Sequence, residues 1–156
     1  MHRSFEQARR GVATVEAAVI LPIAILLLIG TWEVGRMIEV QEILNNAARE
    51  GARQAASGVM TAAQVQQVVS NYVQNAGLAA TSATVTVADL THSGVDPTLA
   101  TQMDQLQVTV TIPFSAVRWS TTSLIATSAT NLTAQANWFS ARGLAYPTNV
   151  NPPPGN

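Results

Sequence analysis

The longest apolar stretch of the chain runs from Val12 to Trp32 and contains one charged residue, Glu16. Because an α-helix rises about 1.5 Å per residue, this run of about twenty residues can cross the roughly 30 Å hydrocarbon core of a bilayer. A removable secretory signal has a shorter apolar core of roughly 7–15 residues, followed at once by a small-x-small cleavage site. The pattern therefore predicts a transmembrane helix.

Beyond Trp32, apolar and small residues recur at three- and four-residue spacing as far as residue 56, which predicts that the same helix continues outside the membrane. The stripe consists of Val34, Met37, Val40, Leu44, Ala47, Gly51 and Ala55. Small residues in its distal half allow another helix or a sheet to approach closely. That neighbour is either the protein's own domain, which we favour, or another subunit in a fibre.

A second, shorter helix is predicted after Gly58, which stands where a helix C-cap belongs. Thr61 and Gln64 have the spacing of a capping box that opens this helix, and Gly77 ends it. We expect its apolar face to lie in the core. That face consists of Val65, Val68, Val69, Tyr72, Val73 and Ala76.

After Gly77 the apolar residues alternate instead, which is typical of half-buried strands. The alternating segments are 83–87, 106–114 and 132–138. Pro113 must lie at a strand end or edge, because proline cannot donate to a ladder. One apolar sheet face needs a cover, which the two helices supply. The chain is predicted to have an α+β fold with a small antiparallel sheet of about three strands.

These patterns divide the chain into four parts. Residues 1–11 form a basic leader, and residues 12–57 form the transmembrane helix with its extracytoplasmic continuation. A small α+β extracytoplasmic domain occupies residues 58–140. The Pro-rich residues 141–156 form a flexible tail.

The distribution of charge indicates how the helix is oriented. Arg3, Arg9 and Arg10 precede the apolar run, and glutamates predominate just after it. The positive-inside rule therefore predicts a single-pass membrane protein with its N-terminus in the cytoplasm and its C-terminal domain exported. With 47% hydrophobic and only 11% charged residues, the composition is poorly suited to a free soluble protein, so part of the apolar surface is expected to contact lipid or a partner.

Composition also excludes several kinds of chemistry. The chain has no cysteine, and with a formal net charge of −1 it cannot build a basic face of useful size for nucleic acid. Residues 88–105 contain His92 with Asp89, Asp96 and Asp104, but one histidine is insufficient for zinc and the acidic residues are sparse for calcium. We expect a plain surface loop, no metal or cofactor, no small-molecule substrate and no enzymatic activity.

Glu16 needs an explanation, since an unpartnered acidic side chain in a membrane helix costs roughly 2.5–3.5 kcal/mol on insertion scales. One alternative is an uncleaved anchor whose glutamate reaches the interface near the positive end of the helix dipole. The other comes from the segment Gly11 to Glu16, which follows two arginines and places the glutamate fifth after the glycine.

This arrangement resembles the processing site of type IV prepilins. The resemblance implies that a prepilin peptidase cuts between Gly11 and Val12 and that Glu16 serves in subunit assembly. The new amine of Val12 is then a natural partner for Glu16 of a neighbouring subunit. Such pairing would make the buried charge a device for packing helices side by side.

The segment VEAAVILPIAILLLIGTWEVGR, followed by NNAAREGARQAA, is similar to TadE-like minor pilins of the tight-adherence (Tad, or Flp) pilus. The resemblance covers roughly residues 10–57. Ala17 stands where major Flp pilins usually have tyrosine, which favours a minor pilin or pseudopilin. The resemblance implies a pilin-like arrangement of the α+β fold and a location in the bacterial inner membrane. It also implies prepilin peptidase, other pilin subunits, the inner-membrane assembly platform and the lipid bilayer as partners, and adhesion as the role of the whole apparatus.

Other residues of this segment are candidates for helix geometry and contact. Pro22 interrupts helical hydrogen bonding and is either a kink or a tolerated membrane proline. Arg49 and Arg53 lie one turn apart, and Glu50 can pair comfortably with only one of them, so the other is available to a partner together with Gly51. The competing function is an uncleaved membrane-anchored binding module or accessory protein of a secretion apparatus.

Overall fold

The computed structural model describes residues 2–118 and 130–143, with side chains from Val12 onward. Most of the predicted tail, residues 144–156, lies outside the described residues, as do the side chains of the leader. Along the described chain the elements are α1 (His2–Ala56), α2 (Ala62–Asn75), η1 (Ala80–Ser82), β1 (Thr84–Asp89), β2 (Gln105–Pro113), η2 (Phe114–Ala116) and β3 (Asn131–Phe139).

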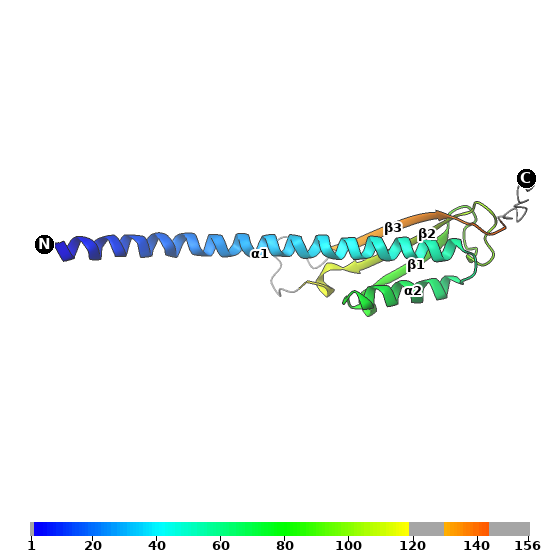
Figure 1. The fold of residues 1–156 in the computed structure, drawn as a ribbon, viewed down its shortest axis with the longest axis horizontal. Helices are drawn as coiled ribbons and strands as arrows, with labels where there is room; N and C mark the ends of the chain where they lie inside the picture. Colours follow the sequence, from blue (N-terminus) through cyan, green and yellow to red (C-terminus); the bar gives the residue numbers. More distant parts are fainter. Residues whose placement is uncertain (1, 119–129, 144–156) are drawn as a thin grey trace, which may run out of the picture.

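Helix α1 dominates the molecule. Its N-terminal half projects alone, and its C-terminal half packs against the strands and α2 (Figure 1). The helix ends where the sequence predicts: Gly58 takes a φ of +66° just beyond Ala56, a conformation that glycine adopts without steric cost. One continuous helix thus connects the apolar segment directly to the folded domain.

The strands form an antiparallel sheet in the order β1-β2-β3. Its outer face is polar, and cross-strand pairs fix the register there: Gln107 bonds Asn137 at 3.0 Å, and the Thr111 and Thr133 hydroxyls lie 3.1 Å apart. Pro113 is the last residue of β2, as predicted. The predicted α+β fold with a three-stranded sheet is confirmed.

The inner face of the sheet meets both helices. In β2 the inward side chains of Leu106, Val108, Val110 and Ile112 are all fully buried. Helix α1 covers β2 and β3, and α2 packs against α1 and β1. The small residues of α1 allow this close approach, since Ala47, Ala48, Ala52 and Ala55 are also completely buried.

Some expected core residues lie at the surface instead. Helix α2 buries Val65, Val69 and Val73, while Tyr72 is 38% exposed and Ala76 is exposed. With α1 and β1 on one side of α2, only a narrow stripe is covered. Trp138, near the end of β3, is 46% exposed, although earlier residues on its face of the strand are buried.

The predicted capping box at the start of α2 is confirmed. The Gln64 side chain accepts a hydrogen bond from the Thr61 amide at 2.9 Å, and the Thr61 hydroxyl accepts one from the Gln64 amide at 3.3 Å. Asp96 joins the same helix end, accepting from the Ala62 amide at 2.9 Å. This bond, with those from Thr98, lowers the pKa of Asp96. The loop after β1 is thereby held against α2.

Candidate functional site

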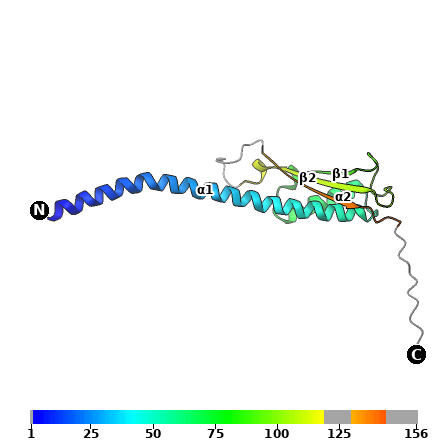
Figure 2. The ribbon, with the colours of Figure 1, turned by 90° about the horizontal axis from the view of Figure 1, so that it is seen from above.

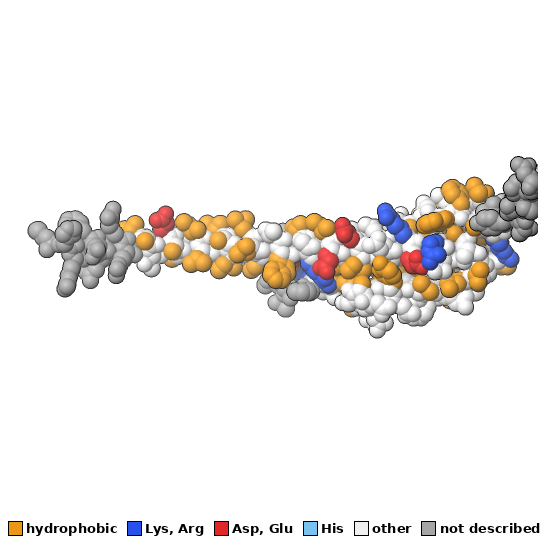
Figure 3. All heavy atoms as spheres, viewed as in Figure 1, with side chains coloured by type: hydrophobic (Ala, Val, Ile, Leu, Met, Phe, Trp, Pro, Cys, Tyr) orange, Lys and Arg blue, Asp and Glu red, His pale blue; other side chains and the backbone are white. Residues whose placement is uncertain are grey.

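The projecting half of α1 offers an apolar surface to its surroundings. Among the described residues, α1 is the single helix long and apolar enough to cross a membrane, and the protein buries none of its most apolar window. Figure 3 shows hydrophobic side chains along this part of the helix. A core helix of a soluble protein would be covered, so the arrangement is consistent with a single-pass membrane anchor.

Glu16 is exposed near the beginning of this apolar surface. It lies one helical turn after Val12, so the two residues share a face of α1. Among the described side chains the nearest arginine along α1 is Arg36, twenty residues or about 30 Å farther on. A cation that pairs with Glu16 at this depth therefore comes from the leader, from a chain terminus created at Val12, or from another molecule.

Gly11 and Pro22 both lie within α1. The helix continues through Pro22, and Figure 2 shows that its N-terminal half is curved rather than straight. Proline lacks the amide proton that would bond the carbonyl four residues earlier, so curvature in this region has a ready physical cause. A functional kink at Pro22 stays a prediction, with a tolerated membrane proline as its alternative.

The folded domain begins directly at the end of the apolar segment. Arg36 donates from Nε to the carbonyl of Val117 at 3.1 Å, and Gln41 donates to the carbonyl of Thr133 at 2.9 Å. These bonds brace α1 against the near end of the sheet. A pocket of about 420 Å³ lies at this junction and is lined by Leu28, Ile29, Trp32, Glu33, Arg36, Phe114 and Arg118.

Patterns along the sequence do not indicate this junction. Glu33 is only 5% exposed although it directly follows the apolar run. Phe114, which follows β2 and is distant in sequence, lines the same pocket as Glu33. Periodicity along one helix cannot reveal such a contact.

The distal candidates on α1 serve the protein's own fold. Gly51 is buried, and a Cβ atom added to it would lie 2.5 Å from Cγ2 of Val69 and 3.1 Å from Cγ1 of Val108. Arg53 donates two hydrogen bonds to Glu50, at 2.9 and 2.6 Å. The bond from Arg53 is also the main cause of the lowered pKa of Glu50.

Arg49 is the other arginine on this face. It is exposed, and within residues 2–118 and 130–143 it makes no ion pair, which leaves it available to a partner. The candidate residues therefore form two groups: Gly11, Val12, Glu16 and Pro22 in the anchor, and Arg49, Gly51 and Arg53 about 50 Å farther along α1. They do not form one compact site.

Comparison with known families places the similarity on this helix. The family model of TadE-like proteins matches residues 11–53, a segment that contains every candidate residue named above. The resemblance to TadE-like proteins is thus confirmed and supports a protein associated with the Tad pilus. Comparison with curated proteins and with solved structures gave no match.

Proposed function

We propose that this chain, whose residues 11–53 match the TadE-like family, is a minor pilin of a Tad-type pilus. In this proposal prepilin peptidase removes residues 1–11 at the cytoplasmic face of the inner membrane. The mature subunit stays anchored by α1, with its C-terminal domain exported, until it enters the fibre. Its role is structural rather than enzymatic.

The observation that carries the proposal is the position of the family match. It begins at Gly11 and follows α1 to residue 53, so the shared feature is the helix rather than the sheet domain. In a bilayer, helices associate through close packing and interhelical polar contacts. A single helix with one acidic residue near its beginning suits lateral assembly of many copies.

The local chemistry supports a role for Glu16 in that assembly. Cleavage after Gly11 removes the three leader arginines and creates an α-amine on Val12. A neighbouring helix can present this amine to Glu16, which otherwise stands in an apolar surface without another charge. Removing one partner of a buried charge pair typically costs about 3–5 kcal/mol, so the pair would also select the correct register between subunits.

The competing function is an uncleaved, membrane-anchored binding module or an accessory protein of a secretion apparatus. The pocket between α1 and Phe114 and the exposed Trp138 are the features that a binding module would use. This alternative requires no fibre and no cleavage, and it leaves Glu16 dispensable.

Fibre fractions distinguish these functions. In cells that produce the Tad pilus, we expect antibodies against the exported domain to detect the protein both in membranes and in fibres sheared from the cell surface. Deletion of the gene should reduce the number of fibres, and the intact gene should restore it. A protein confined to membranes, with fibres unchanged by its deletion, would instead favour the anchored module.

A further inference from the structure

The connection between β1 and β2 brings three metal-binding side chains together at the end of the domain remote from the apolar segment. Asp89 ends β1, Asp104 immediately precedes β2, and His92 lies in the connection. One potential ligand atom from each side chain lies within 4.8 Å of the other two. The antiparallel register explains this proximity, because Asp89 pairs directly with Leu106.

Asp89 contributes an oxygen atom that lacks a hydrogen-bond partner. Its Oδ1 atom accepts hydrogen bonds from the amides of Thr91 and His92, both at 2.8 Å. Its Oδ2 atom is buried without a partner, in a residue only 4% exposed. Leaving a buried polar atom unsatisfied is unfavourable, and more so when the group is charged. A bound cation would satisfy this oxygen.

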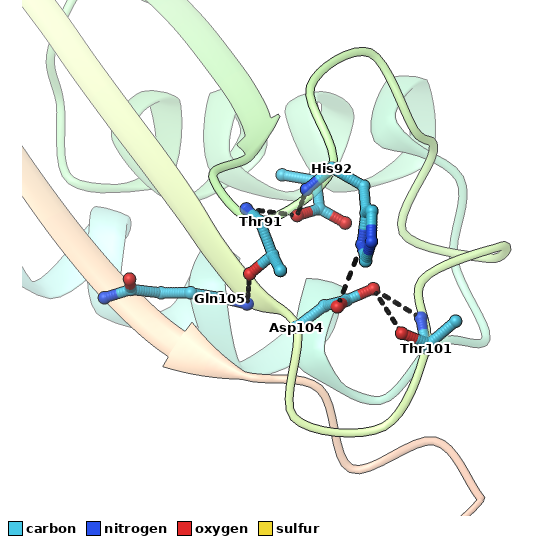
Figure 4. Close-up of polar contacts among 6 residues, drawn as sticks. Thr91, His92, Thr101, Asp104 and Gln105 are labelled. Atoms are coloured by element: carbon cyan, nitrogen blue, oxygen red, sulfur yellow. Dashed lines mark hydrogen bonds and ion pairs between the residues drawn. The ribbon is translucent and has the colours of Figure 1, made fainter.

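The other two ligands are already aimed at each other. Nδ1 of His92 lies 3.1 Å from Oδ1 of Asp104, and Figure 4 shows the imidazole ring pointing toward that carboxylate. The Thr101 amide and hydroxyl hold the second oxygen of Asp104 at 2.6 and 2.9 Å. Asp104 is 3% exposed, whereas the His92 side chain is 56% exposed. The cluster is therefore buried at Asp104 and open to solvent at His92.

We propose that Asp89, His92 and Asp104 bind one divalent transition-metal ion of the zinc class, with water completing the coordination. Two carboxylate oxygens and one imidazole nitrogen form a donor set that suits Zn²⁺, and three protein ligands plus water are a common zinc arrangement. The open side at His92 provides room for the water and a route of entry.

Calcium fits this cluster less well. It takes six to eight oxygen ligands, and the neighbouring hydroxyls are already engaged. The Thr91 hydroxyl accepts from the Gln105 amide at 2.9 Å, and the Thr101 hydroxyl bonds Asp104. The sequence predicts a surface loop without metal, because a single histidine alone is insufficient for zinc. The fold places two buried carboxylates beside that histidine, and the sequence pattern does not reveal this proximity.

Bound metal would tie the ends of β1 and β2 to the intervening loop. The same region holds the end of β3, since the Ser140 amide donates to the Asp104 carbonyl at 2.8 Å. A ligand that binds only the folded state stabilises it by mass action. The site would therefore stiffen the tip of the exported domain.

The test uses the full-length chain in detergent micelles, purified without a polyhistidine tag and freed of metal with a chelator. Titration calorimetry with ZnCl₂ should give one Zn²⁺ per chain. His92→Ala and Asp89→Asn should each weaken binding by at least about tenfold, the lower end of what loss of even an outer-shell partner costs. Asp89→Asn keeps an oxygen for the two amide hydrogen bonds, so the turn should be retained.

The chain supplies a matched control, because its only other histidine is His2 in the leader. His2→Ala should bind Zn²⁺ as the wild-type protein does, and circular dichroism should show that all variants are folded. Absence of binding at about 1 mM ZnCl₂, the concentration at which even the weakest extracellular Ca²⁺ modules are occupied, would overturn the proposal. So would Zn²⁺ binding that survives both site variants, or Ca²⁺ binding that is as tight as Zn²⁺ binding and insensitive to His92→Ala.

Discussion

Replacing Glu16 with alanine is expected to leave the protein in the membrane and to remove it from the fibres. The substitution makes insertion easier, because it deletes the only charge between Val12 and Trp32. In the proposed assembly it also deprives the neighbour's Val12 amine of its partner, at a cost of about 3–5 kcal/mol when one member of a buried pair remains. Since about 1.4 kcal/mol is a factor of ten in an association constant, we expect at least a hundredfold less protein in sheared fibres.

Two further variants serve as comparisons. One separates charge from shape at position 16, and the other removes a charge elsewhere on α1. Glu16→Gln keeps the size of the side chain but not the charge, so it should fail to assemble as well. Glu42→Gln neutralises an exposed glutamate on the same helix outside the membrane and should assemble normally. The intact mass of each variant shows whether it is still cut after Gly11. Wild-type amounts of Glu16→Ala in fibres would contradict the proposed pairing.

Replacing Gly51 with leucine is expected to unfold or severely destabilise the folded domain. Even a Cβ atom at this position would lie 2.5 Å from Cγ2 of Val69, and both Val69 and Val108 are fully buried. Valine has little rotamer freedom with which to yield. Overpacking commonly costs about 1–3 kcal/mol for added methylenes, and a whole leucine side chain should cost at least about 3 kcal/mol.

Gly35→Ala is the matched control on the same helix. A Cβ atom at Gly35 meets nothing within 4 Å, so this change should be neutral or stabilise α1 by up to about 1 kcal/mol. Urea unfolding of the domain in micelles, monitored by its resistance to protease, compares the two variants. A wild-type midpoint for Gly51→Leu would mean that α1 does not pack on α2 and β2 as described.

Local patterns along the chain predicted much of the fold. The alternation from Leu106 to Ile112 identified β2 and its buried face, and the Thr61–Gln64 spacing identified the start of α2. Each signal depends on residues close together in sequence, where helical or strand periodicity directly determines which face is covered. The continuous α1 followed from the same rule.

Contacts between distant segments were beyond such reasoning. Whether Gly51 faces the protein's own domain or a neighbour depends on where α2 and β2 pack, and α1 alone does not reveal it. The exposure of Tyr72 and Trp138 depends on how far the helices extend over the sheet. Asp89 and Asp104 meet only because of the register between β1 and β2.

Processing after Gly11 is the central claim, and the intact mass of the protein tests it most directly. The protein should be purified from cells with and without an active prepilin peptidase. We expect a chain that begins at Val12 in the first case and a chain that retains residues 1–11 in the second. The same mass in both cells, or a mature chain that begins at any other residue, would contradict the account.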